Sequence, residues 1–469
     1  MNKYIIAGFF AVVSMPNISV SAQKPNVVFI LADDMGYGDA GFTGQKKIQT
    51  PNLDAYASEG IVFNDFYAGA PVCSPSRFCL ITGRNMGHAT IRGNGTIQGG
   101  IAGHKGKQVV PRANILPSDS TIGNLMTSAG YVTGLMGKWH IDGYDTLATP
   151  SQHGFNDFKG WLISQPETYV STYWPEKWWD NGHLIDIPQN KNGRKGYYTC
   201  DIITDESIDF LSKRKKDGKP FFLMVNHSNP HSPLDAPIHP FYKDSSWDEN
   251  LKTYASMVTY LDESVAKIIR FLQKSGLDKN TIVLFTSDNG PRSEPTPELT
   301  RVATFFQSAG PLRGYKRDLT EGGIREPFFA WSGIKGFANG TQVDEPAYFP
   351  DLLPTLGGIA SFKNIQSYPT EGKDLSKFLF ASSQKTSTAT SKDRFLYWEF
   401  FEGGYKQAVR FGKWKALIVK KQIQLYDLSK DAGEKNDLAG VHPDVVEKIR
   451  DFLETCRTES PYWPTTTQQ

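Results

Sequence analysis

Short apolar runs alternate with a helical pattern through the first two thirds of the chain. The runs have the length of buried strands and occupy residues 26–31, 221–225 and 281–286. Between the second and third runs, apolar residues recur at three- and four-residue spacing over residues 254–274, which is the pattern of an amphipathic helix. Strands that alternate with amphipathic helices predict an α/β sandwich with a large, mostly parallel central sheet.

The pattern changes after about residue 360, where Ser, Thr and Lys dominate residues 361–392. Segments with the pattern of antiparallel strands follow at residues 395–398, 408–411 and 414–419. Apolar residues on one face of residues 445–453 then predict a closing helix. We therefore predict a large domain over residues 23–360 and a smaller C-terminal α+β subdomain with an antiparallel sheet over residues 361–469.

The first 22 residues have the pattern of a secretory signal peptide. Lys3 supplies the positive charge, residues 5–13 are apolar, and the small residues at 20–22 suit a cleavage site. The apolar part is shorter than the ~20 residues that a membrane-spanning helix requires. We expect an exported protein, periplasmic or secreted, with a mature chain that begins near Gln23.

Composition narrows the class of partner. The 469 residues include 51 Lys and Arg against 49 Asp and Glu, so nothing predicts general binding to nucleic acid or to a membrane. The 10 Trp and 20 Tyr are many for this length, and such side chains can form carbohydrate-binding surfaces, although most belong to cores. Residues 161–198 are rich in Trp, Tyr, Gly, Pro and Asn, and predict an extended surface insertion that shapes specificity.

One of the four cysteines lies in a distinctive segment. Residues 73–84 read C-S-P-S-R-F-C-L-I-T-G-R. Pro75 suits the first turn of a helix and Ser74 or Ser76 a cap, so Cys73 is predicted at a helix N-terminus, where amides and helix dipole favour an anion. A lone cysteine is more often buried filler, and Cys79 fits that description. A bridge between Cys200 and Cys456 is conceivable, without support from the sequence.

Acidic and amide side chains follow two of the predicted strands. Asp33 and Asp34 come directly after the first apolar run, and Asp288 and Asn289 after the third. Ligands gather at the carboxyl ends of strands in α/β folds, and calcium prefers carboxylate and amide oxygens. Either pair alone is also typical of an ordinary loop.

Several further segments carry candidate chemistry. They are G-K-W-H at 137–140, N-H-S-N-P-H-S-P at 226–233, G-P-L-R-G-Y-K at 310–316, E-G-G-I-R-E-P at 321–327, and L-Y-D-L at 425–428. Together with the Cys73 segment and the acidic strand ends, they resemble the formylglycine-dependent (type I) sulfatases of the alkaline phosphatase superfamily. The resemblance runs in order from about residue 25 to the C-terminus, with Tyr315 standing where glycine is frequent.

The resemblance implies an alkaline-phosphatase-like fold and hydrolysis of sulfate esters. In this family a formylglycine-generating, or sulfatase-maturing, enzyme oxidises the cysteine that corresponds to Cys73 to an aldehyde. Its hydrate attacks sulfur with one hydroxyl and expels sulfate through the other. Calcium is bound in the family by the residues that correspond to Asp33, Asp34, Asp288, Asn289 and the modified Cys73.

The resemblance also assigns roles to the remaining motif residues. Arg77 orders the hydrate, and Lys138 and Lys316 neutralise the sulfate oxygens. His140 takes the proton from the second hydroxyl, and His231 protonates the leaving alcohol. His227, one turn before His231, is the less favoured acid, and Arg84 and Arg325 are expected to be structural.

The sequence predicts the class of substrate, but in less detail than it predicts the reaction. Export and the aromatic-rich insertion favour a sulfated polysaccharide or oligosaccharide, with galactose or N-acetylgalactosamine sulfate as the leading prediction. His88, Arg92 and Asn94, and more weakly His104, are candidate substrate contacts, and an ordinary surface turn explains them equally well. The alternatives are a phosphonate or phosphate diester hydrolase of the same fold, and a glycan-binding protein without catalysis.

Overall fold

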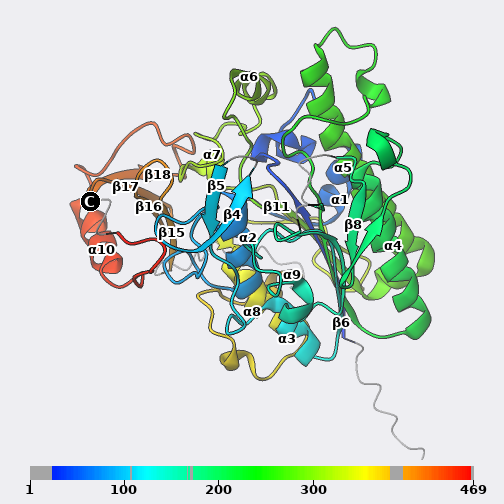
Figure 1. Ribbon diagram of the computed structural model, residues 1–469. Helices are drawn as coiled ribbons and strands as arrows, with labels where there is room; N and C mark the ends of the chain where they lie inside the picture. The colour runs from blue at the N-terminus through cyan, green and yellow to red at the C-terminus, as the bar shows by residue number, and fades with distance from the viewer. Residues whose placement is uncertain (1–23, 106–107, 166, 169–172, 381–393, 466–469) are drawn as a thin grey trace, which may run out of the picture.

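The computed structural model describes residues 24–105, 108–165, 167–168, 173–380 and 394–465 (Figure 1). The predicted signal peptide, residues 1–22, lies outside the described residues. Within the described part of the chain, no helix is both long and apolar enough to cross a membrane.

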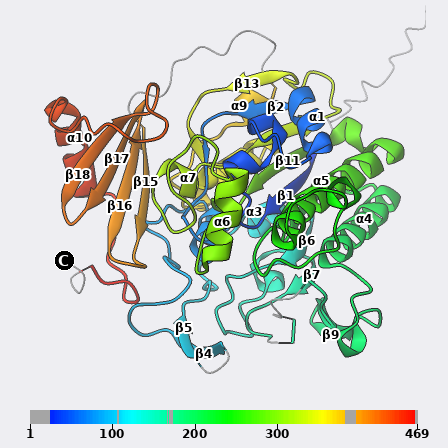
Figure 2. The same cartoon turned by 90° about the horizontal axis from the view of Figure 1, so that it is seen from above.

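A ten-stranded sheet forms the centre of the main body (Figures 1 and 2). Its five central strands are mutually parallel and lie in the order β11 (Thr281–Ser287), β1 (Asn26–Ala32), β10 (Phe221–Asn226), β6 (Val132–Lys138) and β7 (Asp157–Trp161). One edge is completed by β12 (Phe329–Ser332), β2 (Ile61–Phe63) and β13 (Thr341–Val343), and the other by β8 (Lys177–Asp180) and β9 (His183–Asp186). The predicted α/β fold with a mostly parallel sheet is confirmed.

Both faces of the sheet are covered, which explains why the central strands are continuous apolar runs. In β1, Val27, Phe29 and Leu31 pack into one core, whereas Val28 and Ile30 pack into the other. The first core is closed by α2 (Cys73–Thr82), α3 (Ile122–Ser128) and α8 (Leu352–Ile359). The second is closed by α1 (Pro51–Glu59), α4 (Thr199–Asp217) and α5 (Glu249–Ser275).

The helix predicted over residues 254–274 is α5, which begins five residues earlier than its apolar pattern. Its N-cap is Asp248, whose carboxylate accepts hydrogen bonds from the N–H groups of Asn250 and Leu251. The helix ends at Gly276, whose positive φ of 74° suits a glycine C-cap. Capping therefore fixes both ends of the helix, and its added first turn also buries Leu251 in the second core.

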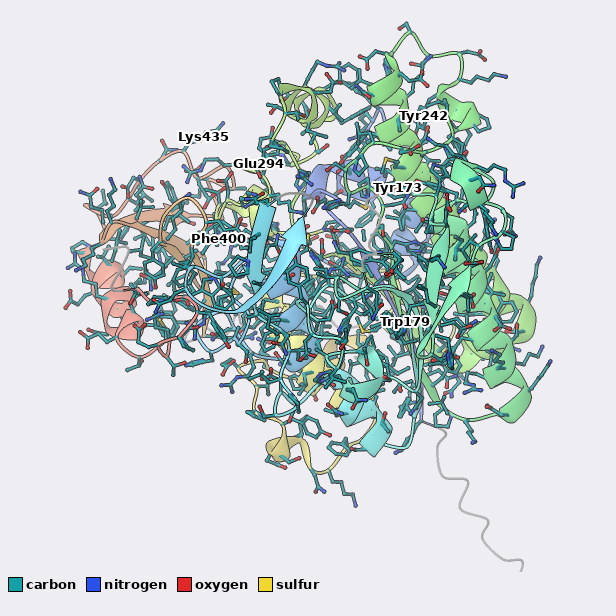
Figure 3. The ribbon with its side chains drawn as sticks, viewed as in Figure 1. Tyr173, Trp179, Tyr242, Glu294, Phe400 and Lys435 are labelled. Carbon is teal, nitrogen blue, oxygen red and sulfur yellow. The ribbon has the colours of Figure 1, made fainter. Side chains whose placement is uncertain are left out.

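The C-terminal part forms a second, antiparallel sheet beside the main body (Figure 2). Its strands are β15 (Phe395–Phe400), β16 (Lys406–Phe411), β17 (Trp414–Val419) and β18 (Gln422–Asp427). One face packs on α10 (Pro443–Leu453), and the other packs on the main body, where Phe400 is fully buried (Figure 3). The predicted subdomain is confirmed, although β18 was not predicted as a strand.

Three local expectations differ from the structure. Leu375 and Leu379 pack in the first core of the main body, so the two parts separate nearer to β15 than to residue 360. Residues 161–198 do not form only a surface insertion, because β8 and β9 extend the main sheet. All four cysteines are free, and Cys200 and Cys456 lie in separate clusters, so the bridge between them is not formed. Cys79 is buried in the first core, as predicted.

Candidate functional site

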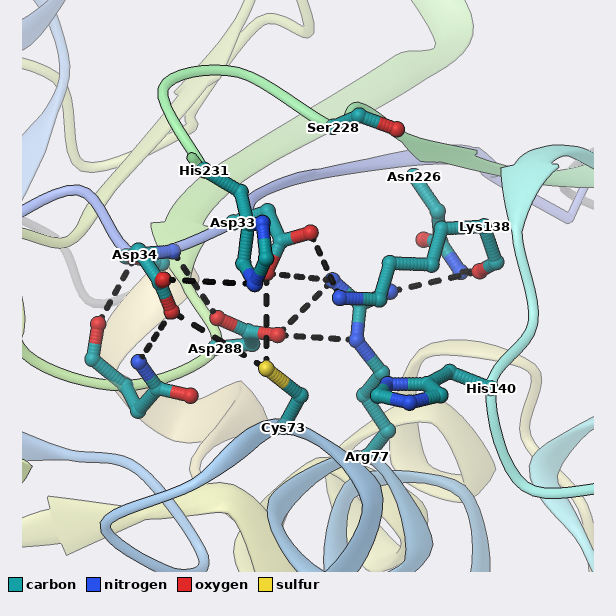
Figure 4. Close-up of polar contacts among 12 residues, drawn as sticks. Asp33, Asp34, Cys73, Arg77, Lys138, His140, Asn226, Ser228, His231 and Asp288 are labelled. Carbon is teal, nitrogen blue, oxygen red and sulfur yellow. Dashed lines mark hydrogen bonds and ion pairs between the residues drawn. The ribbon is translucent and has the colours of Figure 1, made fainter. Parts of the chain in front are cut away.

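The candidate site lies where the carboxyl ends of the central strands meet the N-terminus of α2 (Figure 4). Asp33 and Asp34 follow β1, Asp288 follows β11, and Lys138 ends β6. The strands run parallel, so these side chains reach the same edge of the sheet. In the β1–β11 pair, Ala32 stands opposite Ser287, which puts the two acidic pairs at the same level.

The acidic cluster has the donors of a calcium site. The Asn289 Nδ2 donates to Asp34 Oδ1 over 2.7 Å, and the backbone N–H of Asp34 donates to Asp288 Oδ1 over 3.2 Å. Asp34 Oδ2 and Asn289 Oδ1 are buried without a hydrogen-bond partner among the described residues. Unpartnered buried oxygens are costly unless a ligand satisfies them, so this donor set fits a hard cation.

Cys73 is the first residue of α2 and is almost completely buried, with 1% of its surface exposed. Its Sγ lies 3.1 Å from Lys316 Nζ and 3.5 Å from Asp33 Oδ1. Burial raises the pKa of the thiol to about 12, although Lys138 and Lys316 act to lower it. The unmodified thiol is therefore protonated at neutral pH and is a poor nucleophile.

The predicted serine caps are not used at the start of α2. The N-cap position is Val72, without a side-chain hydrogen bond. The Ser74 hydroxyl instead donates to the carbonyl of His140 over 2.6 Å, and the Ser76 hydroxyl donates to the carbonyl of Asp288 over 2.5 Å. The two serines thus attach the helix to the loops after β6 and β11, and so hold Cys73 against the strand ends.

Three cations surround Cys73 and the acidic cluster, and two of them, Arg77 and Lys138, are seen in Figure 4. Lys138 Nζ lies 2.6 Å from Asp33 Oδ2, and Lys316 forms an ion pair with Asp34. Arg77 Nε donates to Asp288 Oδ2 over 2.8 Å, and Arg77 Nη2 lies 2.8 Å from the same oxygen as an ion pair. Burial acts to raise the pKa of Asp33, but Lys138 and the other nearby cationic side chains outweigh it and hold that pKa below its usual range.

Asp288 differs from Asp33 in the direction of its pKa shift. Burial raises the pKa of Asp288 to about 6, and the attraction of Arg77 only partly offsets this. A bound cation favours the ionised carboxylate, so metal binding at this position would lower the pKa of Asp288.

Two of the predicted histidines face the site. His140 is buried with a φ of 69°, and its Nδ1 has no hydrogen-bond partner among the described residues. Burial, followed by the charge of Lys138, lowers the pKa of His140 well below its usual value, so the ring is neutral in the free enzyme. His231 Nε2 lies 3.6 Å from Asp34 Oδ2, and burial lowers its pKa to about 4. His227 points elsewhere, because its Nε2 lies 3.0 Å from Ser264 Oγ in the core.

A cavity of about 70 Å³ opens beside these groups. The acidic and basic side chains on its wall are Asp33, Lys138, His140 and His231, and the aromatic ones are Trp161, Tyr173 and Trp178. Trp161 ends β7, and the hydroxyl of Tyr173 donates to the carbonyl of Ser228 over 2.6 Å. The aromatic residues come from the stretch 161–198, so this stretch contributes to the site even though part of it is sheet.

Sequence reasoning missed two polar residues at the site. Arg292 Nη1 lies 3.4 Å from His231 Nε2, and Asn226 Nδ2 donates to the carbonyl of Lys138 over 2.9 Å. Asn226 ends β10 and opens the segment that contains His231, and Arg292 follows Asn289 by three residues. Asn226 directly follows a predicted strand, and Arg292 lies in the loop that begins with Asp288 and Asn289; these positions are the signal that could have identified them.

The predicted substrate contacts separate into different environments. Asn94 lies beside the nucleophile, since its Oδ1 accepts a hydrogen bond from the backbone N–H of Ser74 over 3.1 Å. Arg92 is buried and pairs with Glu399 over 2.7 Å, so it is a structural residue and its prediction as a substrate contact is corrected. His88 Nδ1 lies 3.3 Å from Glu371, and His104 lies on β4 (Ile101–Lys105).

The two arginines expected to be structural lie in ion pairs outside the strand-end cluster. Arg84 Nη1 lies 3.2 Å from Glu371, and Arg325 Nη2 lies 2.7 Å from Asp65.

Comparison with known proteins identifies the family. A family model described as Sulfatase matches residues 25–362. The N-acetylgalactosamine-6-sulfatase of Mus musculus is 31% identical over 407 residues, which cover 84% of this chain and 72% of that protein. The N-acetylgalactosamine-6-O-sulfatase of Bacteroides thetaiotaomicron is 27% identical over 509 residues, which cover 93% of this chain and 94% of that protein.

A solved structure extends the similarity to three dimensions. The crystal structure of Ps i-CgsB in complex with k-i-k-neocarrahexaose superposes with a TM-score of 0.75 at 27% identity, and the match covers 94% of this chain and 95% of that one. The matched family model, the relatives and the shared fold agree with the chemistry of the site. The chain belongs to the sulfatase family and is a sulfuric ester hydrolase.

Proposed function

We propose that this enzyme removes sulfate from galactose or N-acetylgalactosamine residues of a sulfated glycan, with a formylglycine made from Cys73 and a bound calcium ion. The observation that carries the proposal is the position of Cys73 Sγ, 3.1 Å from Lys316 Nζ and 3.5 Å from Asp33 Oδ1. The pKa of about 12 supports conversion, because the thiol itself is not ionised at neutral pH.

The residues present fit both groups that the family uses. Asp33, Asp34, Asp288 and Asn289 offer the oxygens of a calcium site, and residue 73 opens toward the same cluster. When present, the hydrated aldehyde supplies one hydroxyl for attack on sulfur and a second for release of sulfate, and calcium supplies positive charge for a sulfate oxygen.

The chain's own side chains then bind the anion and move protons. Lys138 and Lys316 lie next to residue 73 and provide positive charge for the sulfate oxygens, while Arg77 is held by Asp288 with its guanidinium facing the same space. His140 is neutral, and its buried Nδ1 has no hydrogen-bond partner among the described residues, so it can accept the proton whose loss releases sulfate.

His231 has the opposite task, which is to donate a proton to the leaving alcohol. Its Nδ1 lies 2.5 Å from the carbonyl of Ser232, so Nε2 is the nitrogen that faces the site. In the free enzyme burial lowers the pKa of His231 to about 4. A sulfate anion bound among Lys138, Lys316 and His231 favours the protonated ring, because an opposite charge raises the pKa of an imidazole.

The proposed substrate class rests on the relatives and on the aromatic wall of the cavity. Two of the relatives described above are named for N-acetylgalactosamine 6-sulfate, and the superposed structure holds a neocarrahexaose. Trp161, Tyr173 and Trp178 offer the apolar faces that sugar rings bind. Export to the periplasm or the medium, which the N-terminal pattern predicts, agrees with a polymeric glycan as substrate.

The nucleophile is tested by mass spectrometry of protein made with a formylglycine-generating enzyme. Trypsin releases Cys73 in peptide 48–77 and Cys79 in peptide 78–84. We expect the aldehyde in the first peptide and an unchanged thiol in the second, which is the internal control. Full activity of protein whose Cys73 is entirely thiol contradicts the proposal.

The substrate is tested by release of sulfate from defined sulfated mono- and disaccharides, measured by ion chromatography. We expect turnover of galactose or N-acetylgalactosamine sulfates, and none by Cys73→Ala protein. An aryl sulfate and an aryl phosphate diester are compared in parallel. Faster hydrolysis of the diester favours the alternative that this site is a phosphate diester hydrolase.

A further inference from the structure

A second and larger cavity, of about 1040 Å³, lies at one end of the C-terminal sheet. We call it the C-terminal groove. Its walls are the loop between β15 and β16, the turn between β17 and β18, and the end of α10 with the segment that follows it. The catalytic residues described above are absent from this wall.

The wall of the C-terminal groove is rich in positive charge. It carries five cationic side chains, Lys406, Lys420, Lys421, Arg450 and Arg457. The carboxylates on the same wall are Glu454 and Glu459, and Glu459 lies 2.6 Å from Arg457. Among the described residues, no carboxylate lies within 4.0 Å of Lys406, Lys420 or Lys421. These three lysines are therefore available to an anionic ligand.

The turn that presents two of these lysines is strained. Val419 pairs with Gln422, so Lys420 and Lys421 alone connect β17 and β18. Their φ angles are 49° and 64°, the left-handed conformation that a two-residue type I′ turn requires at both positions. Asn-Gly suits that turn, whereas a side chain such as Lys is disfavoured there. Strain that the fold retains at a surface position points to a function for the side chains that cause it.

One loop joins the C-terminal groove to the catalytic site. Glu402, in the loop after β15, accepts a hydrogen bond from the backbone N–H of Asn94 over 3.2 Å and pairs with Arg317, the neighbour of Lys316. Asn94 in turn accepts from the N–H of Ser74, next to Cys73. Gly403, Gly404 and Tyr405, which follow Glu402 directly, line the groove. This one loop therefore borders both the Asn94 segment beside Cys73 and the wall of the C-terminal groove.

We propose that the C-terminal groove binds a sulfated stretch of the same glycan whose terminal sulfate ester occupies the catalytic site. The inference rests on the proposed function, because it takes the substrate to be a polymer with repeated sulfate groups. Lys406, Lys420 and Lys421 pair with the sulfates of the distant sugars, and the groove thereby selects long, densely sulfated chains over short ones.

The test measures binding of a κ-carrageenan hexasaccharide to full-length protein by titration calorimetry. All proteins carry Cys73→Ala, so that no turnover disturbs the measurement. The variant Lys420→Asn/Lys421→Gly removes two charges and installs the residues that the turn prefers. We expect its affinity to fall about tenfold and to depend less on salt. Its melting temperature should not fall, because the new turn is less strained.

The matched control is Lys430→Asn/Lys435→Asn, which removes two exposed lysines beyond the opposite end of β18. This control should bind the hexasaccharide as the parent does, and the desulfated hexasaccharide should bind the parent and the turn variant equally. The proposal is overturned if the parent does not bind the sulfated hexasaccharide, if the turn variant binds as tightly as the parent, or if the control loses as much affinity. Turnover of an aryl sulfate by wild-type protein tests the catalytic proposal separately, since the binding assay needs no chemistry.

Discussion

At the scale of single residues, burial and nearby cations together set the protonation of the groups at the site. It raises the pKa of Cys73 to about 12 and lowers that of His231 to about 4, so both groups are neutral in the free enzyme at neutral pH. Asp33 remains charged, because Lys138 lies 2.6 Å away and opposes the effect of burial. The site thus combines neutral groups that can exchange protons with fixed charges that can bind an anion.

The proposed acid role of His231 predicts a dependence on the leaving group. His231→Asn should lower kcat/KM for a sugar sulfate by about 10²- to 10⁴-fold, because a sugar alkoxide leaves poorly without a proton. For an aryl sulfate such as 4-nitrophenyl sulfate the loss should be about tenfold or less, because the phenolate leaves without help. Steady-state kinetics on both substrates measure the difference. Equal losses on the two substrates contradict the role of an acid and indicate loss of binding.

At the scale of elements, the site depends on two parallel neighbours. β1 and β11 are in register through Ala32 and Ser287, so their carboxyl ends bring Asp33, Asp34, Asp288 and Asn289 together. The sequence predicted both strands and the acidic residues after them, because a strand buried on both faces is a continuous apolar run. It did not predict that β1 and β11 are neighbours, since strand order depends on contacts between distant segments.

The cluster at these strand ends predicts stabilisation by calcium. At a free calcium concentration of 100 times Kd, the free energy of unfolding should rise by about 2.7 kcal/mol. Asn289→Ala should weaken this effect, because it removes an oxygen that has no hydrogen-bond partner among the described residues. Thermal unfolding with calcium, with magnesium and with a chelator measures the effect.

The control variant for the calcium measurement is Asn280→Ala, which changes an asparagine at the opposite end of β11. Calcium should stabilise this variant as it does the wild type. The same melting temperature for the wild type with calcium and with a chelator contradicts the proposed site.

Other elements were missed for physical reasons. β18 was not predicted because its alternating residues, Gln422 to Asp427, bury only their second half. The prediction that Ser74 or Ser76 caps α2 was wrong, because both hydroxyls form tertiary hydrogen bonds to loops far away in sequence. Arg92 was predicted to contact the substrate because local sequence patterns do not reveal its ion-pair partner, Glu399, which lies 307 residues later in the chain. Local patterns thus predict elements and motif residues, whereas the partners of polar side chains depend on the tertiary fold.

At the scale of the whole molecule, a buried charged cluster joins the main body to the C-terminal sheet. Lys415 of β17 lies 2.8 Å from Glu321, the first residue of α7 (Glu321–Ile324), and 3.7 Å from Glu434. The Tyr67 hydroxyl also donates to Glu321 over 2.8 Å. Burial acts to raise the pKa of Glu321, but Lys415 and two arginines outweigh it and lower that pKa to about 2.

This cluster predicts a loss of stability in acid. Because the pKa of Glu321 is lower in the folded than in the unfolded state, its contribution is complete above pH ~4.5 and falls as the pH drops toward ~2, by about 1.4 kcal/mol per pH unit. Glu321→Gln should destabilise the protein by roughly 3–5 kcal/mol at neutral pH, because Lys415 loses a buried partner. The difference between the two proteins should shrink below pH ~4.5.

Urea unfolding of both proteins at several pH values measures this difference. Glu298→Gln, a change of an exposed carboxylate on α6 (Pro297–Phe306), is the control and should alter stability little. A difference between Glu321→Gln and wild type that stays constant down to pH ~2.5 contradicts the assigned pKa.

The burial of Cys73 also determines whether its oxidation can come before or after folding of the chain. Its side chain is enclosed by the first turn of α2 and the strand ends, so another protein cannot reach it once the domain has folded. On the proposed function, the oxidation of Cys73 therefore belongs to the newly made chain, while residues 73–84 are still an unpacked peptide. A chain that folds first keeps its thiol permanently, so the fraction of active enzyme reports the competition between maturation and folding during synthesis and export.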